Sequence, residues 1–256
     1  MSRTATFIAL VLAAIALAAP AATVVPLNTG YDHANFAPYP NVTVPVSTTQ
    51  DNYWINLATY PPTVPVAPTG SWVLQYPGAS WLPPLAGTSW IGPRKSVGSG
   101  AGTTLQNPGY AIFRKCFCLL PNFKNASFSF RLRADDTVQA WFNTQTNVVV
   151  PPQFGRFNAV PIASLPSNPQ WFRTGVNCLY VLVEDTGGWM GFDLAGTIQA
   201  DGLMPIPAFG AGASFRCPCE SGPAGAANDA AIVNAIRQFA EQRRLQRAAI
   251  PLQPHP

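Results

Sequence analysis

Proline and glycine interrupt this sequence so often that long helices are disfavoured over most of its length. There are 27 prolines and 20 glycines among the 256 residues, and neither residue suits a helix interior. Many short strands joined by loops fit such a chain better. Charged residues make up only 10% of the sequence, well below the usual quarter, whereas the hydrophobic share of 48% is ordinary. The composition therefore predicts a mostly β protein.

Strand-like alternation is clearest in Ser127–Ala134, where phenylalanine, leucine and alanine alternate with serine and arginine. One face of such a strand lies in a core, and the other faces water or a second layer. Cys178–Glu184 is almost continuously apolar, which predicts a central strand covered on both faces. Further strands are expected at Tyr53–Leu57, Trp72–Gln75, Tyr110–Leu119, Val138–Asn143 and Phe192–Ala200.

The N-terminus has the pattern of a secretory signal peptide, which we place at residues 1–22. Arg3 supplies a positive charge, an apolar run follows it, and small residues then form a cleavage region around Ala18–Ala22. The alternative is a membrane anchor, but the apolar run is shorter than the roughly 20 residues that a span needs. No later stretch of the sequence is apolar enough for a transmembrane segment. We expect a secreted protein, extracellular or held at the cell surface.

After export, the five cysteines are expected to lie in an oxidising compartment, where disulfides form. They occur as Cys116 and Cys118, a lone Cys178, and Cys217 and Cys219. Two cysteines one residue apart seldom pair with each other, so we predict at least one disulfide between the first pair and the last. Zinc bound by the same four thiols is the alternative, although structural zinc sites usually have wider ligand spacing. Cys178 is left as a buried thiol or as the partner of another cysteine.

The chain divides into a body, a linker and a helix. Residues 23–201 contain all the tryptophans and all the expected strands, and residues 202–227 are rich in proline, glycine and cysteine. Residues 228–250 predict an amphipathic basic helix with Asn228 as its N-cap, and residues 251–256 form a tail. The helix has an apolar stripe, Ile232, Ile236, Phe239 and Ala240, and a basic end, Arg243, Arg244 and Arg247. It either docks on its own domain or is offered to a protein partner or a membrane surface.

Charge and motifs disfavour two broad classes of function. The net charge of +4 is small and scattered, so no nucleic-acid-binding surface is expected. The two histidines, His33 and His255, lie outside any nucleophile or metal motif, so we expect no enzyme activity. Paired carboxylates for glycoside hydrolysis are the remaining catalytic option, among Asp135, Asp136, Glu184, Asp185 and Asp193.

Two N-glycosylation sequons begin at Asn41 and Asn125.

Seven motifs follow one another in the order "LNTGYD", "DNYWINL", "SWI", "YAIFR", "FSFRLRADDTVQAWFN", "FRTGVNCLYVLVED" and "GFDLAGTIQA". Together they resemble the galactose-binding-domain-like family of secreted proteins, over residues 27 to about 200. The resemblance implies an antiparallel jelly-roll β-sandwich, here followed by a C-terminal α-helix. Members of this family bind sugars in many cases and act as scaffolds in others. One departure is Asn143-Thr144, where the family often has Asn-Gly, so this turn is expected to be longer.

These observations favour a secreted, non-catalytic carbohydrate-binding protein. The alternative is a structural subunit of a cell-surface or extracellular assembly. We predict that Trp141 stacks on the sugar, because it lies on the strand face opposite Val138, Ala140 and Phe142, which we assign to the core.

Four more residues complete the predicted site. Asp135, Asp136 and Asn143 are expected to supply polar contacts, and Trp189 to close the site. The plainer role of Asp135 and Asp136 is to accept backbone hydrogen bonds in a tight turn. No cofactor is expected, with a structural calcium ion at the two aspartates as the exception.

Overall fold

The computed structural model describes residues 22–40, 46–60, 68–74, 81–95, 109–155, 157–186, 189–204, 217 and 224–248. The predicted signal peptide up to residue 21, the sequon at Asn41, Cys219 and the tail at 251–256 lie outside the described residues. Among the described residues, no helix is long and apolar enough to cross a membrane.

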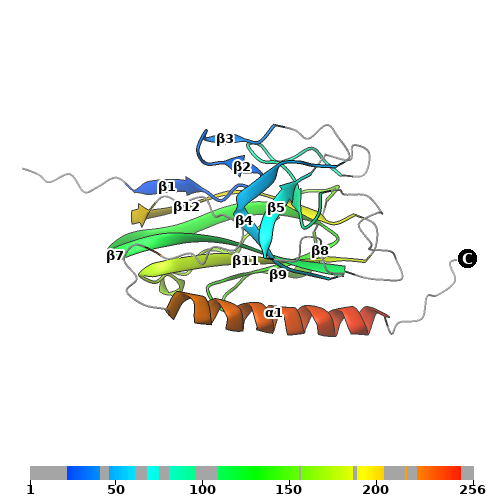
Figure 1. Cartoon of the computed structure of the whole chain (residues 1–256). Coiled ribbons are helices and arrows are strands. Elements are labelled where there is room, and N and C mark those ends of the chain that lie inside the picture. Colours follow the sequence, from blue (N-terminus) through cyan, green and yellow to red (C-terminus); the bar gives the residue numbers. More distant parts are fainter. Residues whose placement is uncertain are drawn as a thin grey trace, which may run out of the picture.

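Strands dominate the described chain, and the helix α1 follows them (Figure 1). The elements are β1 Thr23–Pro26, β2 Tyr31–Asp32, β3 Ala37–Pro38, β4 Gln50–Tyr60, β5 Thr69–Val73, β6 Ile91–Gly92, β7 Gly109–Asp135, β8 Thr137–Phe142, β9 Val148–Phe154, β10 Ile162–Ala163, the 3-10 turn Pro169–Trp171, β11 Gly175–Asp185, β12 Gly191–Met204 and α1 Ala224–Ala248.

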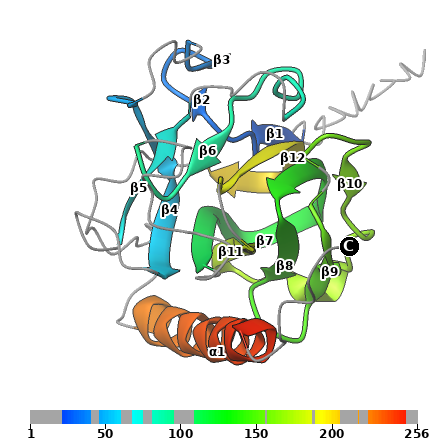
Figure 2. The same cartoon turned by 90° about the vertical axis from the view of Figure 1, so that its right-hand side faces the viewer.

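Ten strands form one antiparallel sheet that closes partway on itself. The strand order is β1-β12-β6-β5-β4-β7-β11-β8-β9, with β10 added to β7, and β12 also pairs with β7. The pairing of β12 with both β6 and β7 makes a ring of strands, so the sheet is a partly closed barrel (Figure 2). The mostly-β fold with a C-terminal helix is confirmed, and the jelly-roll topology stays a prediction.

The longest strand, β7, joins two predicted strands into one. Residues 109–119 pair with β11, and residues 118–135 pair with β12. The predicted strands Tyr110–Leu119 and Ser127–Ala134 are therefore two parts of a single element. Between them, Asn122 and Asn125 have left-handed φ angles of 67° and 55°, and the register against β12 shifts. Such irregularities bend a strand, which lets β7 serve both halves of the sheet.

Alternate residues of each central strand enter two different layers. Val138, Ala140 and Phe142 of β8 lie in the main core, the large apolar cluster enclosed by the sheet. Trp141 lies on the other face, in the helix-facing layer between the sheet and α1. The predicted face assignment of β8 is therefore confirmed. Every residue of β11 is buried, as expected of a strand covered on both faces.

The helix α1 packs along the sheet against β7 and β11 (Figures 1 and 2). Its buried side chains are Val233, Ile236 and Ala240, which contact the helix-facing layer. The prediction that Asn228 caps the helix is wrong, because α1 begins four residues earlier, at Ala224. The alanines at this end of the sequence are strong helix formers, which explains the earlier start. The helix ends at Ala248, two residues before the predicted end.

Two disulfides cross-link the helix-facing layer. Cys118 pairs with Cys217, which confirms a bond between the two predicted cysteine pairs. Cys116 pairs with Cys178, its direct neighbour across β7 and β11, at a Cα–Cα distance of 4.1 Å. The two bonds use three of the four thiols that the zinc alternative needed, Cys116, Cys118 and Cys217. Among the described residues, no group of three or more histidine, cysteine, aspartate or glutamate side chains is arranged to hold a metal ion.

Candidate ligand-binding site

A pocket of about 330 Å³ lies between β8 and α1, on the helix-facing side of the sheet. The sheet and the turn after β8 supply one side, and the helix supplies the other. The described residues that line the pocket are Gln139, Trp141, Gln145, Thr146, Val148, Ala235, Ile236 and Phe239. Its volume lies at the lower end of the range for small-molecule sites in proteins.

The floor of the pocket comes from β8. Gln139 and Trp141 are two residues apart on one strand, so their side chains share a face, and both are buried. The Oε1 atom of Gln139 is fully buried and accepts no hydrogen bond from the described residues. Buried polar atoms of this kind are almost always hydrogen-bonded in native proteins. Because this atom has almost no exposed surface, it is packed inside the floor and is not open to a ligand in the pocket.

Two aromatic rings meet in the pocket. Trp141 of β8 and Phe239 of α1 contact each other edge to face, with their ring centroids 6.2 Å apart. Gln145 and Thr146, in the turn between β8 and β9, are exposed and form the rim. None of the described lining residues carries a charge. The pocket thus combines apolar ring surface with neutral hydrogen-bonding groups.

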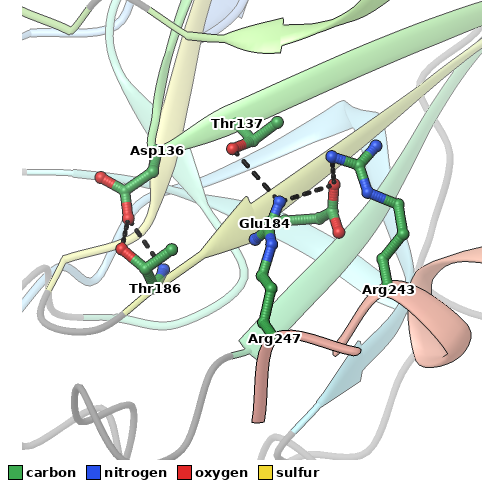
Figure 3. A network of polar contacts seen from close by, with 6 residues as sticks. All are labelled: Asp136, Thr137, Glu184, Thr186, Arg243 and Arg247. Atoms are coloured by element: carbon green, nitrogen blue, oxygen red, sulfur yellow. Dashed lines mark hydrogen bonds and ion pairs between the residues drawn. The ribbon is translucent and has the colours of Figure 1, made fainter. Parts of the chain in front are cut away.

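The helix wall of this pocket is anchored by a buried carboxylate. Arg243 and Arg247 of α1 place their Nη2 atoms 3.2 Å and 3.6 Å from Oε2 of Glu184 on β11 (Figure 3). Arg247 also donates to Oγ1 of Thr137 at 3.5 Å. Burial raises the pKa of Glu184, and the two guanidinium groups oppose that increase. The predicted basic end of the helix therefore binds the chain's own sheet.

Asp135 and Asp136 lie at the β7–β8 connection, and neither is a lining residue of the pocket. Asp135 is buried and accepts a hydrogen bond of 2.7 Å from Nε1 of Trp81. Burial raises the pKa of Asp135 to about 9, and the hydrogen bond and charge of Asp136 add to this shift. Asp136 accepts hydrogen bonds from the backbone N–H and the hydroxyl of Thr186, the first at 2.8 Å (Figure 3). These contacts tie the connection to the end of β11.

The side chains of Asn143 and Trp189 also make their contacts outside the pocket. Asn143 has a left-handed φ of 61°, and its amide nitrogen donates to the backbone oxygen of Trp171 and to Oδ1 of Asn177, each at 2.8 Å. Trp189 is half-buried and packs edge to face on Trp81, at 6.2 Å between ring centroids. Of the five predicted site residues, the pocket contains Trp141 alone.

The sequence analysis missed four functional candidates, Gln139, Gln145, Thr146 and Phe239. Strand alternation places Gln139 on the same face as Trp141, so Gln139 could have been identified from the sequence pattern. Phe239 belongs to the predicted apolar stripe of the helix, but no sequence pattern shows which strand that stripe contacts. Trp81 is 54 residues from Asp135 in the sequence, and no local signal links the two.

A second group of ionisable residues lies on the main-core face. Lys115 of β7 is buried, and its Nζ donates to the backbone oxygen of Asn28 at 3.2 Å and contacts Nε2 of His33 at 3.0 Å. Burial lowers the pKa of Lys115 to about 8, whereas the charge of Asp51 opposes the shift. Burial, followed by the charge of Lys115, lowers the pKa of His33 to about 3. His33 is therefore neutral near pH 7 and helps to hold the N-terminal loop.

The second sequon residue, Asn125, is exposed in the middle of β7. Its side-chain nitrogen donates to Oδ2 of Asp201 at 2.7 Å. Glycosylation at this position stays a prediction.

Comparisons with known proteins give no family. No protein-family model matches the chain, and no curated protein does. One similar solved structure is the PA14 domain of the MpAFP antifreeze protein, at 18% identity and a TM-score of 0.25, covering 38% of this chain and 45% of that one. Another is a family 35 carbohydrate-binding module from an environmental isolate, at 12% identity and a TM-score of 0.33, covering 68% of this chain and 98% of that one. Similarity at these TM-scores carries no argument about function.

Proposed function

We propose that this protein is a secreted, non-catalytic carbohydrate-binding protein with a jelly-roll-type β fold, and that it binds sugar in the pocket between β8 and α1. The observation that carries the proposal is the lining of that pocket. Two aromatic rings border a space whose rim is formed by neutral polar side chains. Small-ligand sites generally combine apolar walls with a few placed polar groups.

This lining suits a sugar because a sugar has two kinds of surface. Its C–H faces pack on aromatic rings, here Trp141 and Phe239, and its hydroxyls need donors and acceptors. The exposed Gln145 and Thr146 at the rim, and the Gln139 side chain that lines the floor, supply neutral hydrogen-bonding groups.

A non-catalytic role is supported by the contacts of the carboxylates that a glycoside hydrolase would need. Glu184 is paired with two arginines, and Asp135 accepts from Trp81. Asp193 accepts from the backbone N–H of Leu85 at 2.6 Å and from the hydroxyl of Thr88 at 2.5 Å. Secretion is supported by the pattern of the N-terminal sequence and by the two disulfides.

The proposal is tested by a glycan array on the mature protein, followed by calorimetric titration with the sugars that bind. We expect Trp141→Leu to weaken binding about tenfold or more, equivalent to about 1.4 kcal/mol. Phe239→Leu, on the helix side of the pocket, is expected to act in the same direction, although the substituted residue lies outside the β-sheet. Trp189→Leu is the matched control, because it removes the same ring from outside the pocket.

Circular dichroism of each variant distinguishes a loss of binding from a loss of folding. If the wild type binds no glycan, or if folded Trp141→Leu and Phe239→Leu both bind as the wild type does, the proposal is wrong. Size-exclusion chromatography of the same sample tests the alternative role in an assembly. In that alternative the helix stripe would have to leave the sheet, because Val233, Ile236 and Ala240 are buried against it.

A further inference from the structure

On the helix side of the pocket, a series of contacts links the buried carboxylate of β11 to one of the lining rings. We infer that Arg243 is a positioning residue for ligand binding: held by Glu184, its guanidinium group sets the position of the Phe239 ring in the pocket. The inference rests on the proposed function and concerns the same pocket. It gives Arg243 a part in ligand affinity that Arg247, the other arginine on this carboxylate, does not have.

The two rings of the pocket are restrained to different degrees. Trp141 has an exposed fraction of 4% and lies in β8, which pairs with β11 and β9, so close packing within the sheet fixes its ring. Phe239 is only half-buried, on the helix, and its ring centroid is 6.2 Å from that of Trp141. A half-buried side chain has fewer neighbours than a core residue, so each contact has more influence on its orientation. Phe239 is therefore the ring that a neighbouring group can position.

Arg243 is such a neighbour. It follows Phe239 by four residues, about one helical turn, so the two side chains lie on the same face of α1. The Cζ atom of Arg243 lies over the Phe239 ring, 5.3 Å from its centroid, which is within the range of a cation–π contact. A guanidinium group is planar and remains charged, so it packs well on an aromatic face.

The carboxylate of Glu184 holds the arginine in this place. The Nη2 atom of Arg243 is 3.2 Å from Oε2 of Glu184, and the Glu184 side chain is only 3% exposed (Figure 3). A long arginine side chain loses much rotamer freedom when it is ordered, and this ion pair to a central strand offsets part of that cost. The contacts therefore run from β11 through Arg243 to the Phe239 ring and so to the pocket.

Arg247 provides a matched comparison, because it contacts the same carboxylate oxygen but has a different second partner. Its Nη2 atom is 3.6 Å from Oε2 of Glu184 and 3.5 Å from Oγ1 of Thr137. Arg243→Met and Arg247→Met would each leave Glu184 paired with one arginine. Only Arg243→Met removes the guanidinium group that packs on Phe239.

Calorimetric titration of the mature protein tests the inference, with the array glycan that the wild type binds most tightly as the probe. Arg243→Met should weaken binding about three- to fivefold, the loss expected for one partly exposed cation–π contact. Arg247→Met should leave the affinity unchanged. Arg243→Lys should recover most of the affinity, because lysine keeps a cation beside the ring. Denaturant unfolding of each variant shows whether it is folded.

A double-mutant cycle distinguishes positioning of the ring from a general effect on the helix. If Arg243 acts through Phe239, Arg243→Met should cause no further loss of affinity in the Phe239→Leu background. Arg243→Gln replaces Arg243→Met in the same cycle if the methionine variant does not fold.

The outcomes separate this inference from the proposed function. Wild-type affinity in folded Arg243→Met, an equal loss in Arg247→Met, or a loss that adds in full to that of Phe239→Leu overturns the inference and leaves the proposed function standing. Absence of glycan binding by the wild type overturns the proposed function and this inference with it.

Discussion

The two faces of the sheet are covered in different ways. The main core is filled mainly by the sheet's own side chains, with Phe113 packed on Phe192 at 4.7 Å between ring centroids and Phe117 on Phe142 at 6.0 Å. The helix-facing layer depends on a separate element, α1, which is held by ion pairs to Glu184. A disulfide also joins the sheet to Cys217, which precedes the helix in the sequence.

This difference explains where the pocket lies. A sheet that curves around its own core can fill that core closely, because neighbouring strands place side chains at fixed spacing. A single helix laid on the other face leaves gaps beside it, and one of these gaps is the pocket between β8 and α1. The main core therefore stabilises the fold, whereas the helix-facing layer provides the candidate site.

Breaking the disulfide next to the helix should have the largest effect on stability. Cys118→Ala with Cys217→Ala opens a loop of 99 residues, which corresponds to about 4–5 kcal/mol of unfolding free energy in the chain-entropy treatment. We expect hydrogen exchange to speed up in α1 more than in β7 and β12. Denaturant unfolding and exchange mass spectrometry measure the two effects.

A matched control is Cys116→Ala with Cys178→Ala, which opens a loop of 62 residues within the sheet. It is also predicted to lower the unfolding free energy by about 4 kcal/mol. In this variant, however, hydrogen exchange should not speed up more in α1 than in the sheet. Equal acceleration of exchange across α1 and the main-core strands in the first variant would show that the helix-facing layer is not a separate unit.

The buried lysine of the main-core face should produce a smaller, pH-dependent effect. Since the pKa of Lys115 is lowered to about 8, the folded protein loses this proton near pH 8, while the unfolded chain keeps it until about pH 10.4. The unfolding free energy therefore gains a favourable contribution as the pH rises from 8 to about 10, by at most about 1.4 kcal/mol per unit. Below pH 8 this contribution is constant.

Lys115→Met should remove this slope, because methionine fills similar space without a titrating group. The measurement is the difference in unfolding free energy between wild type and Lys115→Met at several values from pH 7 to 10. A difference that is independent of pH would show that Lys115 keeps its ordinary pKa in the folded protein.

Much of the fold follows from local sequence patterns. The apolar continuity of Cys178–Glu184 and the alternation in Val138–Asn143 correctly indicated which faces of β11 and β8 are buried. The unity of β7 could not be predicted, because the stretch between its two halves contains Pro121 and two asparagines, which are typical of a turn. Its continuity depends on pairing with β12, far away in the sequence.

The candidate site was predictable only in part, because it too depends on contacts between residues that are far apart in the sequence. Trp141 was identified because its position in a strand fixes its face. The pairing of Cys116 with Cys178 depends on the register of β7 and β11, and the contact of Phe239 with Trp141 depends on where the helix docks. Such long-range contacts are set by tertiary packing, and a single sequence contains no local signal for them.

The central claim is that the gap between β8 and α1 is a binding site and not a packing defect, and filling it tests that claim most directly. Ala235 is half-buried on α1 and lines the pocket, so Ala235→Phe places a ring inside it, whereas Gln238→Phe adds the same ring to an exposed position as control. The account predicts that Ala235→Phe changes the unfolding free energy by no more than about 1 kcal/mol and weakens sugar binding at least tenfold, with the control unaffected. Sugar binding that persists at wild-type affinity in folded Ala235→Phe would contradict it.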